Sequence, residues 1–135
     1  MSFNNNEPTA CLMGRFSPWN EGHEALIKHT LGLCDPDYKN KKSDARQVVL
    51  LVRDVGQDLD EIKDNVDDVI SDFPEWVGYV ECIKIPNVVD LFFGKQLTID
   101  MHRLNLHEDV EPGYIEKTSA EDSAAQREFF RNRAG

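Results

Sequence analysis

Short apolar runs alternate with amphipathic segments along this chain. Residues 10–13 and 47–52 are almost continuously apolar, and a third run extends over residues 77–85 before a proline. Runs of this length are typical of strands, and the β-branched run at 47–52 is typical of a central strand buried on both faces. The pattern therefore predicts three strands separated by longer segments of a different periodicity.

Two segments between these runs have the spacing of amphipathic helices. The first has His23 in its opening turn and carries apolar side chains on a broad face as far as Cys34. The second spans residues 58–73, and Pro74 limits it because the residue before a proline avoids the helical region. Its apolar positions recur at steps of three and four, at Leu59, Ile62, Val66, Val69, Ile70 and Phe73.

The alternation of strands and helices predicts an α/β fold. Strands that alternate with helices form a parallel sheet, so we expect a single Rossmann-like domain over residues 1–135, an open sheet with helices on both faces. A chain of 135 residues with 40% hydrophobic side chains suffices for one core. We expect residues 1–9 to be flexible and residues 118–135 to form a C-terminal helix that opens with a Thr118-x-x-Glu121 capping box.

The segment between the first strand and the first helix has the composition of a phosphate-binding loop. This 14–23 loop reads Gly-Arg-Phe-Ser-Pro-Trp-Asn-Glu-Gly-His. Free N–H groups and the positive end of the dipole at a helix start attract anions, and His23 adds a directional donor. Alternatively, His23 is a structural histidine of the helix face. Gly14 and Gly22 either permit tight turns or let a phosphate approach the backbone.

The 14–23 loop resembles the signature of the HxGH nucleotidyltransferases, the cytidylyltransferase-like superfamily. The form GRFxPxHxGH is typical of the nicotinamide-nucleotide adenylyltransferase-like branch. The first His of that signature is Asn20 here, which makes the motif NxGH. Asn20 can orient a phosphate but carries no charge, so it stabilises less transition-state charge. The positions that match the signature are Gly14, Arg15, Phe16, Pro18, Gly22 and His23.

Two further segments resemble nucleotidyltransferase-like proteins of phage, so the resemblance covers roughly residues 10–100. One comprises residues 52–54 (Val-Arg-Asp), and the other comprises residues 85–87 (Ile-Pro-Asn) with the later residues 92–95 (Phe-Phe-Gly-Lys). Ligands gather beyond the carboxyl ends of parallel strands, so residues 53–54 and 86–87 should share an edge with the 14–23 loop. The second family signature, ISxTxxR, has only a poor counterpart at residues 118–123, with Arg127 displaced further along.

The resemblance implies transfer of a nucleoside monophosphate from ATP or CTP to a small phosphorylated or hydroxyl acceptor, with release of pyrophosphate. Mg²⁺ would enter with the triphosphate, and we expect no metal site of the protein's own. The implied catalytic residues are His23 and Asn20. The implied phosphate-binding residues are Gly14, Arg15, Phe16, Ser17, Gly22 and Arg127, and the acceptor or base pocket would comprise Arg53, Asp54, Asn87 and Phe93.

Other interpretations stay open at this point. Asn20 and the poor second signature favour a catalytically impaired relative that binds nucleotide or serves as a structural or interaction protein. Charge alone permits an acidic mimic that binds a basic partner. A homo-oligomer or a protein partner that completes the site is compatible with each of these interpretations.

Charge and cysteine usage narrow the classes of partner. A net charge of −10 argues against general nucleic-acid binding, because that affinity comes largely from Lys and Arg. Eight of the acids lie in residues 54–72, which we interpret as a solvated helix face. Three cysteines without CxxC spacing indicate a reducing compartment. No apolar run approaches a membrane span and no signal peptide is evident, so we expect a cytoplasmic protein that does not bind membranes.

Overall fold

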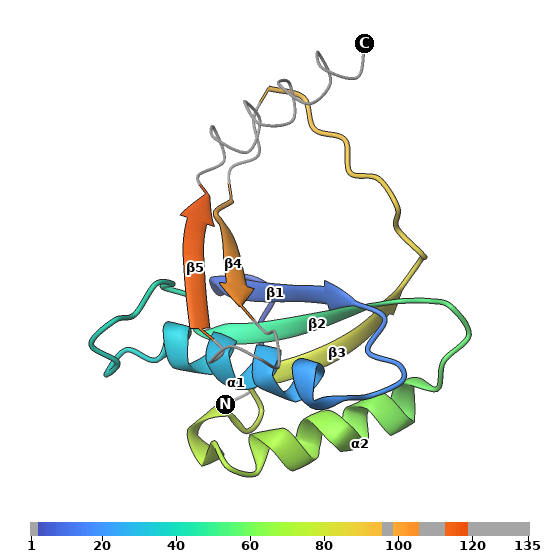
Figure 1. Ribbon diagram of the computed structural model, residues 1–135, viewed down its shortest axis with the longest axis horizontal. Coiled ribbons are helices and arrows are strands. Elements are labelled where there is room, and N and C mark those ends of the chain that lie inside the picture. The colour runs from blue at the N-terminus through green and yellow to red at the C-terminus, as the bar shows by residue number, and fades with distance from the viewer. Residues whose placement is uncertain (1–2, 96–98, 106–112, 119–135) are drawn as a thin grey trace. The chain divides into compact units, whose positions relative to one another are not determined.

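The computed structural model describes residues 3–95, 99–105 and 113–118 of the chain. The chain divides into two units, Met1–Val88 and Val89–Gly135. The first unit holds the parallel sheet and its helices, and the second holds an antiparallel strand pair (Figure 1). The elements in chain order are β1 (Thr9–Gly14), α1 (Glu21–Cys34), β2 (Gln47–Arg53), α2 (Leu59–Ile70), the 3₁₀ turn η1 (Pro74–Trp76), β3 (Val80–Ile85), β4 (Met101–Asn105) and β5 (Gly113–Thr118).

The first unit confirms the α/β prediction. Its sheet has the order β1-β2-β3, and both neighbouring pairs are parallel. Gly14 lies opposite Val52, and Val52 lies opposite Lys84, so the three strands end close to the same edge. Each strand is joined to the next through a helix, which parallel neighbours require.

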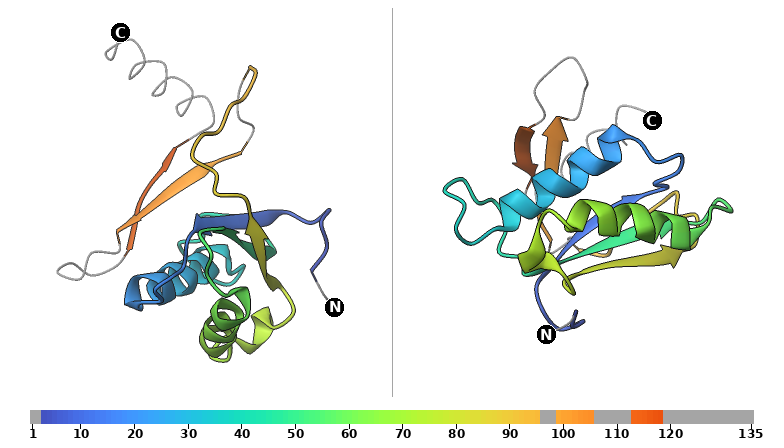
Figure 2. Two further views of the ribbon diagram at one scale, coloured as in Figure 1. Left: turned by 90° about the vertical axis from the view of Figure 1, so that its right-hand side faces the viewer. Right: turned by 90° about the horizontal axis from the view of Figure 1, so that it is seen from below.

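Both described helices of this unit cover the same face of the sheet (Figure 2). On that face Val48, Leu50 and Val52 of β2 are fully buried, and Ile27 of α1 is buried with them. The sequence predicted helices on both faces, and this detail differs. Strands that add in the order β1-β2-β3 through right-handed crossovers place every connecting helix on one side.

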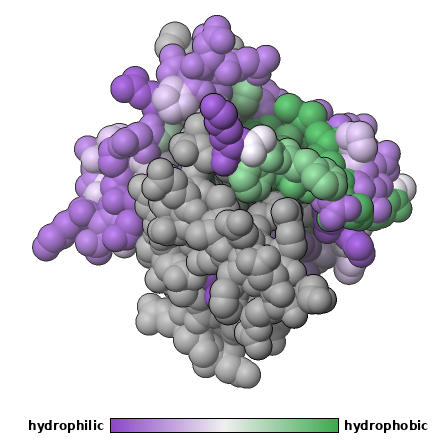
Figure 3. Space-filling model, turned by 90° about the horizontal axis from the view of Figure 1, so that it is seen from above, coloured by the Kyte–Doolittle hydropathy of each residue, from purple (hydrophilic) through white to green (hydrophobic). Residues whose placement is uncertain are grey.

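The opposite face of the sheet carries partly exposed apolar side chains. Met13 and Ile83 are about half exposed, and Cys11 is also exposed. Val49 and Leu51 of β2 point the same way and are only partly buried. The expectation that β2 is buried on both faces is therefore wrong for the first unit. The view from above shows apolar residues gathered at the surface beside hydrophilic ones (Figure 3).

Two element boundaries differ from the prediction for local reasons. Helix α2 ends at Ile70 rather than at residue 73, because a turn in which Phe73 N–H donates to the Ile70 carbonyl leads into η1. Strand β3 begins at Val80 rather than at residue 77. Gly78 has a positive φ of 85°, and this turn must finish before an extended strand can start.

The second unit contains elements that the sequence did not predict. Strands β4 and β5 pair antiparallel with an irregularity at Arg103/Leu104. Their residues lack a regular apolar alternation, which explains why the pattern missed them. Thr118 is the last residue of β5, and the rest of the predicted C-terminal helix, with Glu121 and Arg127, lies outside the described residues. No helix in the described part of the chain is long and apolar enough to cross a membrane.

Candidate functional site

The 14–23 loop leaves the sheet at the carboxyl end of β1 and leads directly into α1. Arg53 is the last residue of β2, and the N–H of Asp54 donates to the carbonyl of Ile85, the last residue of β3. The segments around residues 53 and 86 therefore share one edge with the loop, as the sequence predicted.

Phe16 forms the packed centre of the loop. Its side chain is 1% exposed, and its ring centroid lies 5.3 Å from that of His23. Its φ is 54°, in the left-handed region that bulky residues rarely adopt. Strain of this kind persists where surrounding packing over-determines the backbone, and it is concentrated at functional sites. Phe16 thus shapes the loop from inside, while the neighbouring Ser17 side chain is exposed.

His23 is held by its Nδ1 atom. Nδ1 accepts a hydrogen bond from the backbone N–H of Asn20 at 3.2 Å, and the Trp19 ring lies against the imidazole with centroids 5.4 Å apart. Partial burial lowers the pKa of His23 below its usual value. Since Nδ1 is an acceptor, the neutral ring carries its proton on Nε2. The lowered pKa favours the neutral imidazole, and its Nε2–H has no protein acceptor among the described residues.

Asn20 caps the helix that His23 begins. Its Oδ1 accepts hydrogen bonds from the backbone N–H groups of Gly22 at 2.8 Å and of His23 at 3.2 Å. The sequence pattern predicted that helix-start amides are free for an anion, but the Asn20 carboxamide engages those of Gly22 and His23. Asn is among the best N-cap residues, which accounts for the difference.

The two glycines of the loop have different reasons to be glycine. A Cβ at Gly22 would lie 3.0 Å from Asn20 Oδ1, so a side chain there would crowd the atom that caps the helix. A Cβ at Gly14 would lie 3.4 Å from the nearest atom of the Phe16 ring, which is ordinary contact, and Gly14 does not adopt a left-handed conformation. Nothing in the packing or backbone of the loop demands glycine at position 14, and close approach of a ligand would.

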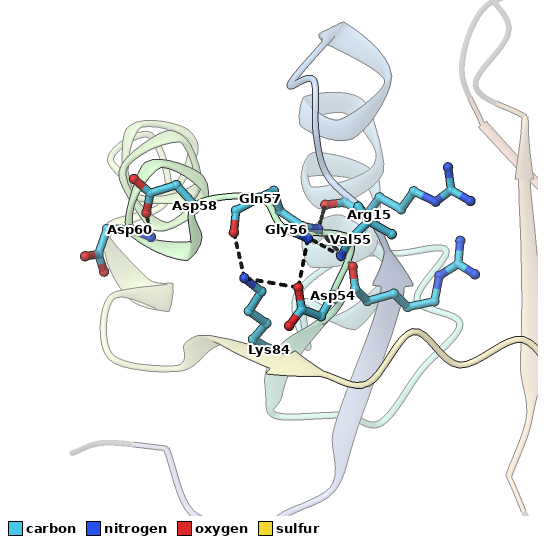
Figure 4. Close-up of polar contacts among 9 residues, drawn as sticks. Arg15, Asp54, Val55, Gly56, Gln57, Asp58, Asp60 and Lys84 are labelled. Atoms are coloured by element: carbon cyan, nitrogen blue, oxygen red, sulfur yellow. Dashed lines mark hydrogen bonds and ion pairs between the residues drawn. The ribbon is translucent and has the colours of Figure 1, made fainter.

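Gln57 connects the 14–23 loop to the end of β2. The sequence pattern did not identify this residue. Its Nε2 donates to the carbonyl oxygens of Arg15 at 2.8 Å and Arg53 at 2.9 Å, while its Oε1 accepts from the N–H of Val55 at 2.8 Å (Figure 4). The sequence signal was weak. Gly56, with a φ of 92°, marks a turn, but nothing in the pattern points to the residue after it.

Asp54 and Lys84 complete this turn. Asp54 Oδ1 accepts from the N–H of Gly56 at 2.9 Å and pairs with Lys84 Nζ at 3.3 Å. The Gly56 hydrogen bond, with a smaller contribution from Lys84, lowers the pKa of Asp54. Lys84 Nζ also donates to the Gln57 carbonyl at 2.7 Å. The Asp54 carboxylate is thus engaged in the turn that the sequence assigned to an acceptor or base pocket.

Of the two arginine side chains at this edge, one is exposed and the other donates a hydrogen bond to the backbone. The Arg15 side chain is exposed and extends away from the Asp54–Lys84 pair (Figure 4). Arg53 Nη1 donates to the carbonyl of Val88 at 3.1 Å and so braces the segment after β3. Asn87 lies in that segment and is exposed. Phe93 belongs to the second unit, and its place in an acceptor or base pocket stays a prediction.

One hollow of the first unit lies away from the 14–23 loop. It has a volume of about 1420 Å³ and is lined by Cys34, Trp76 and Tyr79, together with residues that precede β1 and β2. None of the predicted site residues that the structure describes lines it. It lies at the amino-terminal edge of the sheet, opposite to the 14–23 loop, and is an alternative location for a ligand.

The described residues contain no cluster of three or more His, Cys, Asp or Glu side chains that could hold a metal ion. Comparison of the chain with protein-family models, with curated proteins and with solved structures found no match.

Proposed function

We propose that this protein binds the phosphates of ATP or CTP at the 14–23 loop and transfers the nucleoside monophosphate to a small acceptor. The observation that carries the proposal is the held imidazole of His23. Its Nδ1 accepts from the Asn20 N–H, and its Nε2–H has no protein acceptor among the described residues. His23 lies in a loop whose Gly14 has no need to be glycine in the packing that the structure describes. Arg15, an exposed residue of the same loop, supplies positive charge.

The proposed reaction consists mainly of positioning and charge stabilisation. An acceptor oxygen attacks the α-phosphorus in line, and pyrophosphate leaves. His23 Nε2–H donates to a non-bridging phosphate oxygen, where negative charge builds up in the transition state, and the Arg15 guanidinium offsets charge on the polyphosphate. Mg²⁺ that enters with the triphosphate neutralises part of its charge. No covalent intermediate on the protein is needed.

One observation favours the catalytically impaired alternative. The carboxamide of Asn20 occupies the amides of Gly22 and His23, which would otherwise be available to a phosphate. The chain then offers fewer donors to the developing charge than two imidazoles and a free helix start would offer. In this alternative the protein binds nucleotide at the same loop without turnover.

Calorimetric titration of Mg-ATP and Mg-CTP tests the proposal. We expect wild type to bind one of them and His23→Ala to bind it at least tenfold more weakly, about 1.4 kcal/mol. The matched control is His29→Ala, which removes an imidazole from the same helix far from its start. Absence of binding by wild type, or equal affinities for wild type and His23→Ala, would contradict the proposal. Pyrophosphate release with candidate acceptors then separates the enzyme from the impaired relative.

A further inference from the structure

We propose that Gln57 is a positioning residue for the nucleotide site, holding the 14–23 loop in register with the end of β2. The inference rests on the proposed function and deepens it, because Gln57 reaches the ligand only through the residues it holds. Its carboxamide joins the backbones of Arg15 and Arg53, which carry guanidinium groups from adjacent strand ends.

The register of the sheet explains why such a bridge is needed. The pairing of β1 with β2 ends at Gly14 opposite Val52. The next residues along the two strands are Arg15 and Arg53, and no strand pairing holds them together. Both carbonyls accept from the same Gln57 Nε2, at 2.8 and 2.9 Å, so one side-chain amide replaces the backbone ladder beyond its end.

The carboxamide is itself anchored on every side. Its Oε1 accepts from the Val55 N–H, and the Gln57 carbonyl accepts from Lys84 Nζ of β3 at 2.7 Å. The turn therefore ties the ends of all three strands of the sheet to one residue. A group with both N–H donors and its oxygen engaged has one orientation, since any rotation breaks several hydrogen bonds at once.

This arrangement has a consequence for binding. Arg15 is the first residue of the 14–23 loop beyond Gly14, so the Gln57 bond to its carbonyl fixes where Arg15 and its guanidinium leave the sheet. His23 is held separately, by the Asn20 cap of α1. Misplacement of phosphate-binding groups by about 1 Å can cost about a hundredfold in rate. Removal of the carboxamide should therefore weaken nucleotide binding through Arg15, without any lost contact between Gln57 and the nucleotide.

A double-mutant cycle with Mg-ATP as the probe tests this route. We expect Gln57→Met, which keeps length and loses the hydrogen bonds, to weaken binding about fivefold in wild type and less than about twofold in an Arg15→Ala background. The matched control is Asp58→Ala, which removes the α2 cap in the same turn without touching Arg15 or Arg53. It should change affinity by less than about twofold in either background.

Equal effects of Gln57→Met in the two backgrounds, or an effect no larger than that of Asp58→Ala, would overturn the inference. Gln57→Asn provides a second variant if Gln57→Met does not fold, because its shorter carboxamide cannot span both carbonyls. If wild type binds Mg-ATP and His23→Ala weakens it while the cycle is additive, only the role of Gln57 fails. If wild type does not bind, the proposed function and this inference fail together.

Discussion

Asn20 and His23 cap each other. Asn20 Oδ1 accepts from the backbone N–H of His23, and His23 Nδ1 accepts from the backbone N–H of Asn20, each at 3.2 Å. Asn20 and His23, the two residues of the NxGH motif that could contact a phosphate, thus form a reciprocal helix cap when no ligand is bound. One consequence is chemical: His23 has only Nε2 left for a ligand, and the helix amides are reached only if Asn20 moves.

Asn20→Asp tests the capping role and the phosphate-binding role of this position separately. A carboxylate keeps the acceptor for Gly22 and His23 and suits the positive end of the helix, so thermal stability should stay at or above that of wild type. The same negative charge should repel a triphosphate, and we expect Mg-ATP to bind at least about tenfold more weakly. Unfolding and calorimetry on the same samples check both halves. Unchanged affinity would place the phosphates away from Asn20.

Asn20→His restores the family signature and tests for turnover. Histidine is a weaker cap than asparagine, so stability should fall by about 1 kcal/mol. If the chain is an enzyme limited by this position, pyrophosphate release from ATP in the presence of phosphate-monoester acceptors should increase. A rate that stays at background for both proteins, with nucleotide still bound, would favour the impaired relative.

Gly14→Ala is expected to fold and yet lose nucleotide binding. The added Cβ would make ordinary contact with the Phe16 ring at 3.4 Å, and Gly14 has no left-handed conformation to lose. Its free energy of unfolding should therefore stay within about 1 kcal/mol of wild type. Binding of Mg-ATP should weaken at least about tenfold if a phosphate approaches this backbone. Wild-type affinity in a folded Gly14→Ala protein would remove Gly14 from the site.

The left-handed conformation of Phe16 predicts an unusual order of stabilities. Phe16→Ala removes a fully buried ring and should cost about 3–5 kcal/mol. At most positions glycine is worse than alanine, but here glycine relieves the strain of a φ of 54°. We therefore expect Phe16→Gly to be no less stable than Phe16→Ala in urea unfolding. A Phe16→Gly protein less stable by about 1 kcal/mol would contradict this backbone conformation.

The lowered pKa of His23 predicts how stability depends on pH. The unfolded chain has a His pKa of about 6.5, so between that value and the lower folded pKa it binds more protons than the folded protein. The contribution of His23 is complete above about pH 6.5 and is lost as the pH falls toward the folded pKa. Urea unfolding at about pH 7.5 and 5.5 should show a smaller loss of stability for His23→Ala than for wild type. Equal losses would argue against the partly buried His23 ring whose Nδ1 accepts from the Asn20 N–H.

The elements that the sequence predicted well are those with strong local periodicity. The apolar patterns of residues 47–52 and 58–73 predicted β2 and α2, because the apolar side chains of these elements face one core. The side of the sheet that each helix covers was not predictable in this way. The covered side depends on the strand order and on the handedness of the crossover connections. A local pattern of apolar residues determines neither of these.

The candidate site was predictable only in part. An Asn just before an amphipathic segment is a helix-start signal, so the cap at Asn20 could have been identified from sequence. Its competition with a phosphate became clear only from the distances to Gly22 and His23. Gln57 could not be found in advance, because its partners Arg15 and Arg53 lie 42 and 4 residues away and meet only in the folded sheet.

The most direct test of the account is an NMR titration of ¹⁵N-labelled protein with Mg-ATP. We predict that shifts of backbone amides concentrate in the 14–23 loop and around Arg53, and that the His23 Nε2 resonance moves while Nδ1 keeps its acceptor character. Shifts confined to the hollow near Trp76 and Tyr79, or no shifts at saturating nucleotide, would contradict the claim that the loop binds the phosphates.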